Sequence, residues 1–372
     1  MMRQKYDYCH DANGCDISVS GNRFRGGHIP PSSCYNGGMD MSYSSLLSQA
    51  LARRELSPEE MTAAFNGILR GEWTPAQIAG FLIAMKVKGE TPNELAAAAK
   101  TMRDMAQAVP LNDDSAIDTC GTGGDGGGIF NVSTAAAIVA AAAGAKVAKH
   151  GNRAMSGASG SADVLAELGV PLDLSPAEIA ERIQRDNFGF MFAPNHHPAV
   201  RFAVPVRKEL GVRTMFNLLG PMASPAGVRR QVVGVFDSQL LVPYLETLAA
   251  AGALRAMTVH GGGLDEITIA GETDIAELKE GALTRRTITP EDAGLQFAEL
   301  DSLRVSSAAE SAALIRRVLD GEKGAARDMT ILNTAAALIV ADIAEDFADG
   351  AAQAAKAIDS GAAKDKLTAA AS

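Results

Sequence analysis

Cysteine is scarce in this chain, and most of it lies near one end. Of the 4 cysteines in 372 residues, Cys9, Cys15 and Cys34 come early, and Cys120 stands by itself in the body of the chain. A single body cysteine has no partner there for an internal disulfide, which favours a reducing compartment. Because the three early cysteines lack the regular spacing of metal ligands, we expect no zinc site among them.

A net positive charge and long apolar runs are also missing. The formal net charge is −10 and the pI is about 5.2, whereas proteins that grip nucleic acids or anionic membranes usually carry a basic surface. No apolar run approaches the ~20 residues of a spanning helix, and no signal-peptide core is present. We therefore expect a cytoplasmic protein with no nucleic-acid and no membrane partner, in which any phosphate site is local.

Composition changes twice along the chain. Residues 1–41 are rich in Gly, Ser, Asn, Tyr and Cys, which predicts a disordered tail or an upstream extension. Residues 42–112 predict a helical domain, because three capping motifs each precede an apolar stripe. Over residues 113–372, strand, loop, helix and strand follow one another, which predicts an α/β domain. The three capping motifs are Ser57-Pro58-Glu59-Glu60, Thr74-Pro75-Ala76-Gln77 and Thr91-Pro92-Asn93-Glu94.

The glycine-rich stretch from Asp118 to Thr134 carries the strongest chemical signal. Its glycines let the backbone approach a ligand, and consecutive N–H groups can form a concave anion site. The stretch leads into a predicted helix, whose N-terminus favours phosphate, and Asn131 and Ser133 add neutral donors there. It matches neither the P-loop nor the dinucleotide fingerprint. The alternative is a flexible surface turn, but the position between strand and helix favours anion binding.

A second loop, Lys149 to Gly157 with Ser159 to Ser161, follows the next predicted strand. Its cations and hydroxyls suit a pyrophosphate or a ribose, although a solvated basic turn has the same composition. Because it lies one strand after the glycine-rich stretch, an open α/β sheet would bring both loops to one edge. That expectation favours the functional interpretation.

Two further segments are ambiguous when each is considered alone. The aromatic run Phe188–Phe192 could floor a flat pocket and Arg207 could clamp a carboxylate, but spacing alone favours an ordinary helix with Arg207 exposed. Adjacent Asp265 and Glu266 after a glycine turn fit magnesium, which prefers hard oxygen ligands and often shares them with substrate phosphates. A plain acidic turn is the alternative for that pair.

Taken together, these motifs resemble the anthranilate phosphoribosyltransferases, a family of nucleoside phosphorylase-like phosphoribosyltransferases. The resemblance covers residues 44 to about 370. It implies a small N-terminal helical domain, with a returning segment near 195–215, and a large α/β domain with a central, mainly parallel sheet. The motifs that carry it are Gly-Thr-Gly-Gly-Asp, Asn-Val-Ser-Thr, Lys-His-Gly-Asn-Arg, His-His-Pro-Ala, Pro-Val-Arg-Lys-Glu-Leu-Gly, Phe-Asn-Leu-Leu-Gly-Pro and Gly-Leu-Asp-Glu.

The activity that the resemblance implies is a pentosyl transfer in tryptophan biosynthesis. The 5-phosphoribosyl group would pass from phosphoribosyl pyrophosphate to the amine of anthranilate, in a homodimer joined through the helical domain. The implied donor site comprises Gly121, Thr122, Gly124, Asp125, Asn131, Val132, Ser133, Thr134, Lys149, Asn152, Arg153, Ser156, Gly157 and Ser161. The implied anthranilate site comprises Gly121, His150, Asn152, His197, Arg207 and Pro221. The implied Mg²⁺ site comprises Ser133, Asp265 and Glu266.

The chain departs from the family pattern at a few positions. Ile129 stands where the family usually has Thr or Ser, which removes one possible donor to the phosphate. Ala223-Ser224-Pro225 and Gly271-Glu272-Thr273 also differ from the usual residues, and they affect loop geometry rather than the reaction.

Two other functions remain as alternatives. A pyrimidine nucleoside phosphorylase would be expected to carry a Lys-Met-Ser-Gly-Arg-like loop where this chain has Lys-His-Gly-Asn-Arg. A non-catalytic relative that binds nucleic acid should show a basic groove and an altered acceptor site. The acidic charge, together with Arg207 and Asn152, argues against that alternative.

Overall fold

The computed structural model describes residues 41–123, 128–154 and 159–372. The predictions made for the tail and its three cysteines therefore lie outside the described residues. So do those for Gly124, Asp125, Ser156 and Gly157.

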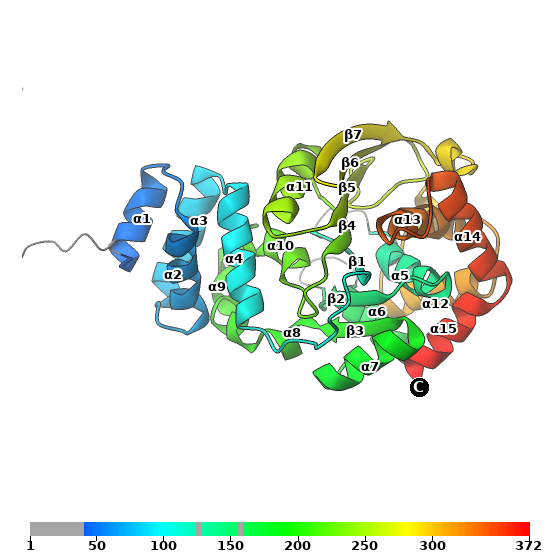
Figure 1. The fold of residues 1–372 in the computed structure, drawn as a ribbon, viewed down its shortest axis with the longest axis horizontal. Coiled ribbons are helices and arrows are strands. Elements are labelled where there is room, and N and C mark those ends of the chain that lie inside the picture. The colour runs from blue at the N-terminus through cyan, green and yellow to red at the C-terminus, as the bar shows by residue number, and fades with distance from the viewer. Residues whose placement is uncertain (1–40, 124–127, 155–158) are drawn as a thin grey trace, which may run out of the picture. The chain divides into compact units, whose positions relative to one another are not determined.

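The capping motifs of the first part of the chain each begin a helix. The side chains of Ser57, Thr74 and Thr91 accept the backbone N–H of the third helical residue, whose own side chain returns the bond, and a proline opens each helix. In Figure 1 the helices stand side by side as one layer. Their bounds are α1 Tyr43–Leu51, α2 Pro58–Leu69, α3 Pro75–Lys88 and α4 Pro92–Asp104.

A seven-stranded sheet with the order β3-β2-β1-β4-β5-β6-β7 forms the centre of the second part. The first five strands in this order run parallel, whereas β6 and β7 pair antiparallel at one end. The expected α/β fold with a mainly parallel sheet is therefore confirmed. The strands are β1 Ile117–Gly121, β2 Val147–Gly151, β3 Phe188–Phe192, β4 Arg230–Gly234, β5 Arg255–Gly261, β6 Thr273–Lys279 and β7 Ala282–Ile288.

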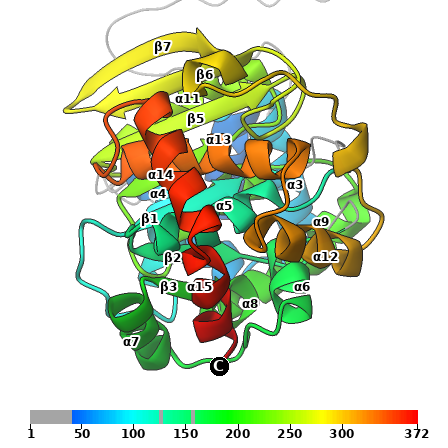
Figure 2. The same ribbon diagram turned by 90° about the vertical axis from the view of Figure 1, so that its right-hand side faces the viewer.

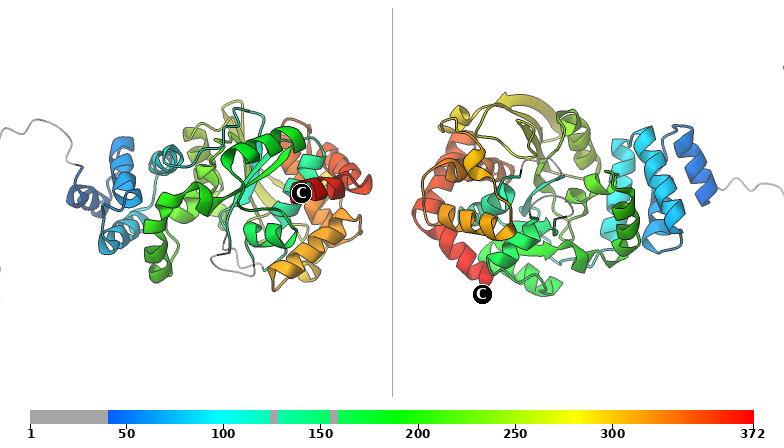
Figure 3. Two further views of the ribbon diagram at one scale, coloured as in Figure 1. Left: turned by 90° about the horizontal axis from the view of Figure 1, so that it is seen from below. Right: turned by 180° about the vertical axis from the view of Figure 1, so that it is seen from behind.

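Successive side chains along a strand point to opposite faces of the sheet, and the two faces pack into different hydrophobic cores. Val232 and Met257 pack into the cluster that contains α5 and α13, whereas Val233 and Ala256 pack with α11 and the helical layer. Figures 2 and 3 show α12–α15 on the face away from α1–α4. These helices are α5 Val132–Ala142, α11 Leu241–Ala250, α12 Ala308–Leu319, α13 Ala325–Val340, α14 Phe347–Asp359 and α15 Ala362–Ala371.

Short helices fill the connections that follow β2 and β3. They are α6 Ser161–Glu167, α7 Pro176–Asp186, α8 Ala193–His196, α9 Val204–Leu210 and α10 Phe216–Leu219, with the 3₁₀ turns η1 Pro198–Phe202 and η2 Pro221–Ala223. Among them α9 packs against α3, and α10 packs against α4. The segment after β3 thus rejoins the helical layer.

The strand order places the site. Strand β1 lies between β2 and β4, so the strand order reverses beside it. Strands β2 and β3 extend the sheet on one side of β1, and β4 and β5 extend it on the other. In open α/β sheets, ligands bind at the carboxyl ends of the strands beside such a reversal. The glycine-rich stretch and the Lys149 loop both leave the sheet at this edge.

The aromatic run at 188–192 corrects one sequence-based idea. It forms strand β3, and Phe188 and Phe190 are buried in the core instead of flooring a pocket.

Within the part of the chain that the structure describes, no helix is long and apolar enough to cross a membrane.

Candidate functional site

A cavity of about 1220 Å³ opens at the carboxyl ends of the parallel strands. The glycine-rich stretch, the Lys149 loop, the Asp265–Glu266 pair and the segment from α8 to η2 all contribute to its wall. Segments far apart in the sequence therefore meet in one space. The predicted residues that line it are Gly121, Thr122, Asn131, Ser133, Lys149, His150, Asn152, Arg153, Ser161, His197, Arg207, Pro221, Asp265 and Glu266.

Of the predicted donor-site residues that the structure describes, two do not line this cavity. Val132 and Thr134 are fully buried in the first turn of α5. Asn131 is the N-cap residue of that helix, and the Val132 and Thr134 side chains of its first turn point to the core. Asn131 and Ser133 remain on the cavity wall.

Both carboxylates of the acidic pair accept backbone amides at the cavity. Asp265 Oδ2 accepts the N–H of Gly123 at 2.8 Å, and Glu266 Oε1 accepts the N–H of Ser133 at 3.1 Å. The glycine-loop amide and the α5 N-terminus are thus oriented to bind negatively charged oxygens. A phosphate group would meet the same donors.

Gly234 was not singled out from the sequence, yet it shapes this corner. A Cβ atom at Gly234 would overlap the backbone of Asp265, and one at Gly121 would overlap its carboxylate. Both glycines end neighbouring strands, β4 and β1. A glycine at a strand end is a recognised signal for such a close approach.

Asn131 and Asp163 fix the position of the second loop. Asn131 Oδ1 accepts the hydroxyls of Ser159 at 2.8 Å and of Ser311 at 2.9 Å. Asp163 accepts the N–H of Ala154 at 2.9 Å and forms an ion pair with Arg153 at 2.8 Å. The described residues of this loop are therefore tied both to the start of α5 and to α6.

Two buried ionisable side chains, Lys149 and Asp118, lie on the neighbouring strands β2 and β1. Lys149 is 1% exposed, and its Nζ donates to the carbonyl of Thr119 at 2.5 Å. Asp118 is fully buried and accepts the N–H of His150 at 3.2 Å. Burial raises the pKa of Asp118 to about 6, while the charge of Lys149 opposes that rise. Asp118 was not predicted, although a carboxylate inside an apolar strand is a recognisable signal.

Arg207 reaches the cavity from α9. Its guanidinium lies over the ring of Phe216, with Cζ 5.2 Å from the centroid, and burial lowers its pKa. Lys208, the next residue, is exposed. Spacing alone favoured an ordinary helix with Arg207 exposed. The structure instead places Arg207 on the cavity wall, because Val206 and Phe216 turn that face of α9 inward.

His150 and His197 stand together on the cavity wall. Their ring centroids are 5.3 Å apart, and each side chain is more than nine-tenths buried. Burial lowers the pKa of His150 to about 3 and that of His197 to about 4. Both rings are therefore neutral at pH 7 and offer a polar but uncharged lining.

The oxygen ligands present fit magnesium only if a substrate completes the set. Among residues 41–123, 128–154 and 159–372, no group of three or more His, Cys, Asp and Glu side chains could hold a metal. Asp265 and Glu266 present carboxylate oxygens to the cavity that Ser133 also lines. Magnesium commonly keeps waters and substrate phosphates in its remaining positions.

Family models match most of the chain. A glycosyl transferase family helical bundle domain matches residues 44–106, and a glycosyl transferase family a/b domain matches residues 113–364. The anthranilate phosphoribosyltransferase of Thioalkalivibrio sulfidiphilus is 52% identical over 316 residues, which cover 85% of this chain and 94% of that protein. The chain belongs to the anthranilate phosphoribosyltransferase family.

Solved structures of this family have the same fold. The enzyme of Thermus thermophilus is 42% identical, with a TM-score of 0.83 over 88% of this chain and 98% of that one. The enzyme of Saccharomyces cerevisiae in complex with PRPP and Mg is 28% identical, with a TM-score of 0.80 over 89% of this chain and 98% of that one. The family assignment thus rests on sequence and fold together.

Proposed function

We propose that this chain transfers the 5-phosphoribosyl group of phosphoribosyl pyrophosphate to the amine of anthranilate, giving N-(5-phosphoribosyl)anthranilate and pyrophosphate in tryptophan biosynthesis. The convergence of the glycine-rich stretch, the Lys149 loop, Asp265–Glu266 and Arg207 on one cavity carries the proposal. A yeast relative has been solved with PRPP and Mg, and another structure of it contains 4-fluoroanthranilate. The family relation supports the same pair of substrates here.

Phosphoribosyl pyrophosphate, the donor substrate, occupies the side of the cavity next to the sheet edge. The amides of Gly123 and Ser133 point where they can meet phosphate oxygens, and Lys149 supplies a buried positive charge. Preorganised donors of this kind stabilise the negative charge that develops on departing pyrophosphate. Gly124, Asp125, Ser156 and Gly157 belong to the same proposed site by resemblance.

Mg²⁺ is the proposed metal, held by Ser133, Asp265 and Glu266. When bound, it would neutralise charge on the pyrophosphate oxygens. Asp265 and Glu266 would provide its carboxylate ligands, and the amides of Gly123 and Ser133 that these carboxylates accept lie beside the same site.

Anthranilate occupies the side formed by α9 to η2. Arg207 can hold its carboxylate through two parallel N–H donors, and Asn152 lies on the facing loop. Carbon 1 of the ribose develops oxocarbenium character as its bond to pyrophosphate breaks, and the amine then attacks it and releases one proton to solvent. No residue is assigned as a general base, because both nearby imidazoles have lowered pKa values and are weak bases. Positioning is the main contribution of the chain.

One assay tests the proposed reaction. Purified protein is mixed with anthranilate and Mg²⁺, and anthranilate fluorescence is followed after phosphoribosyl pyrophosphate is added. We expect the fluorescence to fall and pyrophosphate to appear in equal amount. No loss of fluorescence, or phosphorolysis of a pyrimidine nucleoside in its place, would reject the assignment.

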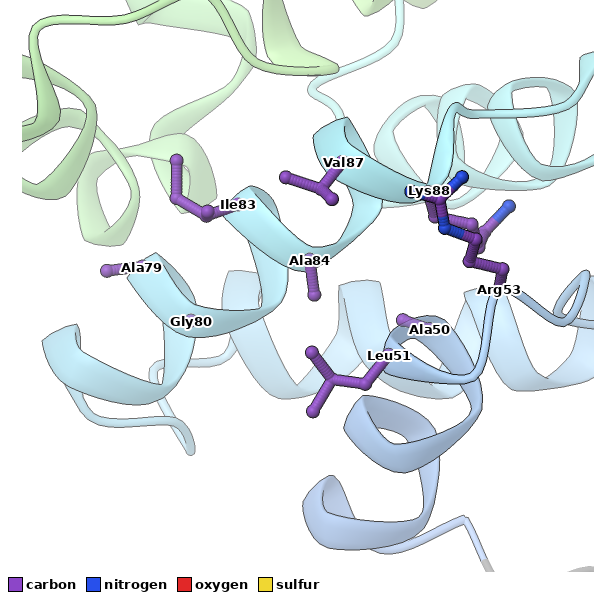
Figure 4. A pocket seen from close by; sticks show the side chains of 9 residues that line it. All are labelled: Ala50, Leu51, Arg53, Ala79, Gly80, Ile83, Ala84, Val87 and Lys88. Carbon is purple, nitrogen blue, oxygen red and sulfur yellow. The ribbon is translucent and has the colours of Figure 1, made fainter.

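We also propose that the chain forms a homodimer through the helical layer. A cavity of about 410 Å³ lies between α1 and α3. Leu51, Ile83 and Val87 are among the side chains that line it (Figure 4). Leu51 is 67% and Val87 is 65% exposed, which is unusual for large apolar side chains. A second copy of this surface is the proposed occupant, because one self-complementary patch suffices for a two-fold dimer.

Sedimentation velocity tests the dimer. The parent should sediment as a species with twice the chain mass of 38.6 kDa. The double variant Leu51→Asp, Val87→Asp should sediment as a monomer while it keeps its helical circular dichroism. A parent that is monomeric at micromolar concentration would reject the proposal. We place the enzyme in the cytoplasm, where Cys120 would stay a free thiol.

A further inference from the structure

A cation–π stack joins two parts of the cavity wall. The guanidinium carbon of Arg213 lies 3.8 Å from the centroid of the Phe236 ring. Arg213 follows α9 in the segment that carries the proposed anthranilate site, and its side chain lines the cavity. Phe236 follows β4 at the edge of the sheet. The two side chains thus come from opposite sides of the proposed transfer.

The Phe236 end of the stack is tied to the glycine-rich stretch. Its backbone N–H donates to Thr122 Oγ1 at 3.1 Å. The N–H of Thr122 donates in turn to the carbonyl of Gly234 at 2.8 Å. Thr122 is buried and stands between the two loop glycines, Gly121 and Gly123. A displacement of the Phe236 backbone would therefore be transmitted to the loop that holds the donor.

The Arg213 end is continuous with the acceptor wall. Thr214 and Met215, the next two residues, are buried. Phe216 then lies under Arg207 and packs against Phe65 of α2, with ring centroids 5.5 Å apart. The acceptor wall is thus anchored in the helical layer on one side, while Arg213 connects it to the sheet edge on the other.

We propose that the Arg213–Phe236 stack fixes the spacing between the acceptor wall and the glycine-rich stretch, so that both are positioning residues for the transfer. The inference rests on the proposed function for the identity of the two substrates. Misplacing one reactant by ~1 Å can lower a rate by about 100-fold. A planar guanidinium against an aromatic ring restrains such movement without touching the reacting atoms.

The chain contains a matched control pair. Arg201 lies over Phe202 at 4.6 Å and also lines the cavity. Both residues belong to the same 3₁₀ turn, η1, so their stack joins no separate parts. Arg201→Gln removes the same charge from the cavity wall as Arg213→Gln. A difference between these two variants therefore shows an effect beyond the lost charge, and the double variant with Phe236 assigns that effect to the stack.

The kinetic arm compares Arg213→Gln, Phe236→Leu and their double variant. We expect each single change to lower kcat/KM for anthranilate about 10-fold, and the double variant to lose about 10-fold rather than 100-fold. Phe236→Tyr should keep the parent rate. Arg201→Gln and Phe202→Leu should each stay within about threefold of the parent. Donor affinity measured without anthranilate should fall by a similar factor in Arg213→Gln and Phe236→Leu, because both loosen the Thr122 loop, and should stay at the parent value in Arg201→Gln and Phe202→Leu.

A second arm needs no substrate. Hydrogen exchange of the amides of Thr122 and Phe236 should be faster in Arg213→Gln and Phe236→Leu than in the parent or in Arg201→Gln. This readout tests the stack even if the parent fails to use anthranilate, an outcome that would count against the proposed function alone. Unchanged exchange, additive kinetic losses, or weaker donor binding in Arg213→Gln alone would each overturn the proposal.

Discussion

His150 and His197 come from different elements, the end of β2 and the residue after α8, yet their rings lie 5.3 Å apart in the cavity wall. Burial is the main cause of the lowered pKa of each, and the proximity of other histidines lowers both further. The folded chain therefore binds fewer protons at these two sites than the unfolded chain does below the usual histidine pKa of 6.5.

The first prediction is a loss of stability on the acid side of neutrality. Stability from these two groups is fully present above pH 6.5 and is lost as pH falls toward 4, the folded pKa of His197, and then 3, that of His150. Relative to neutral pH, the two histidines together should lower the free energy of unfolding at pH 4.5 by on the order of 5 kcal/mol.

The double variant His150→Asn, His197→Asn removes that titration. Its urea unfolding free energy should fall less than the parent's between pH 7.5 and 4.5. An unchanged pH dependence in the double variant would show that other groups cause the acid loss.

The second prediction concerns recognition of the acceptor by Arg207. Arg207→Ala should raise the KM for anthranilate by about 100-fold, because a charge-assisted bidentate contact is lost. Turnover at saturating anthranilate should change much less. The exposed neighbour Lys208→Ala serves as the control and should behave as the parent. A normal anthranilate KM in Arg207→Ala would reject its role.

Local signals predicted the elements that position the site. Ser57, Thr74 and Thr91 each start a helix because cap, proline and third-residue acid or amide act within four residues. The glycine-rich stretch lies between β1 and α5 as its sequence predicts. These features depend on chemistry that neighbours in sequence can supply.

Long-range contacts were beyond such reasoning. Gly234 is required by the backbone of Asp265, and Arg213 meets Phe236 only after the segment beyond β3 returns to the sheet edge. The sequence alone did not show whether Arg207 is exposed or lines a pocket, because its burial is decided by Phe216 and the helical layer. The antiparallel pairing of β6 with β7, the last strand at one end of the sheet, was likewise not predicted.

The third prediction addresses the acidic pair. Asp265→Asn with Glu266→Gln keeps acceptors for the amides of Gly123 and Ser133 but removes the charge that a divalent ion needs. Donor use should weaken, and the Mg²⁺ concentration for half-maximal rate should rise at least tenfold. The exposed carboxylate variant Asp237→Asn is the control. An identical magnesium titration in the parent and the double variant would refute the metal site.

The fourth prediction compares two capping boxes of different burial. Glu94 in α4 is fully buried, where it accepts the N–H groups of Leu56 and Thr91, both at 2.8 Å, and pairs with Lys88 at 2.7 Å. Glu178 closes the same kind of box at α7 but is exposed. Glu94→Ala should lower the free energy of unfolding by about 3–5 kcal/mol, because it leaves a buried ammonium unpaired.

Glu178→Ala removes the same cap interaction without leaving a buried charge unpaired, so it should lower the free energy of unfolding much less than Glu94→Ala does. Urea unfolding of the two variants at pH 7.5 measures both values. Since Lys88 is 3% exposed in its side chain, the further change Lys88→Met in the Glu94→Ala background should recover part of the loss. Equal losses in the two single variants, or no recovery in the double variant, would mean that the buried ion pair does not stabilise the helical layer.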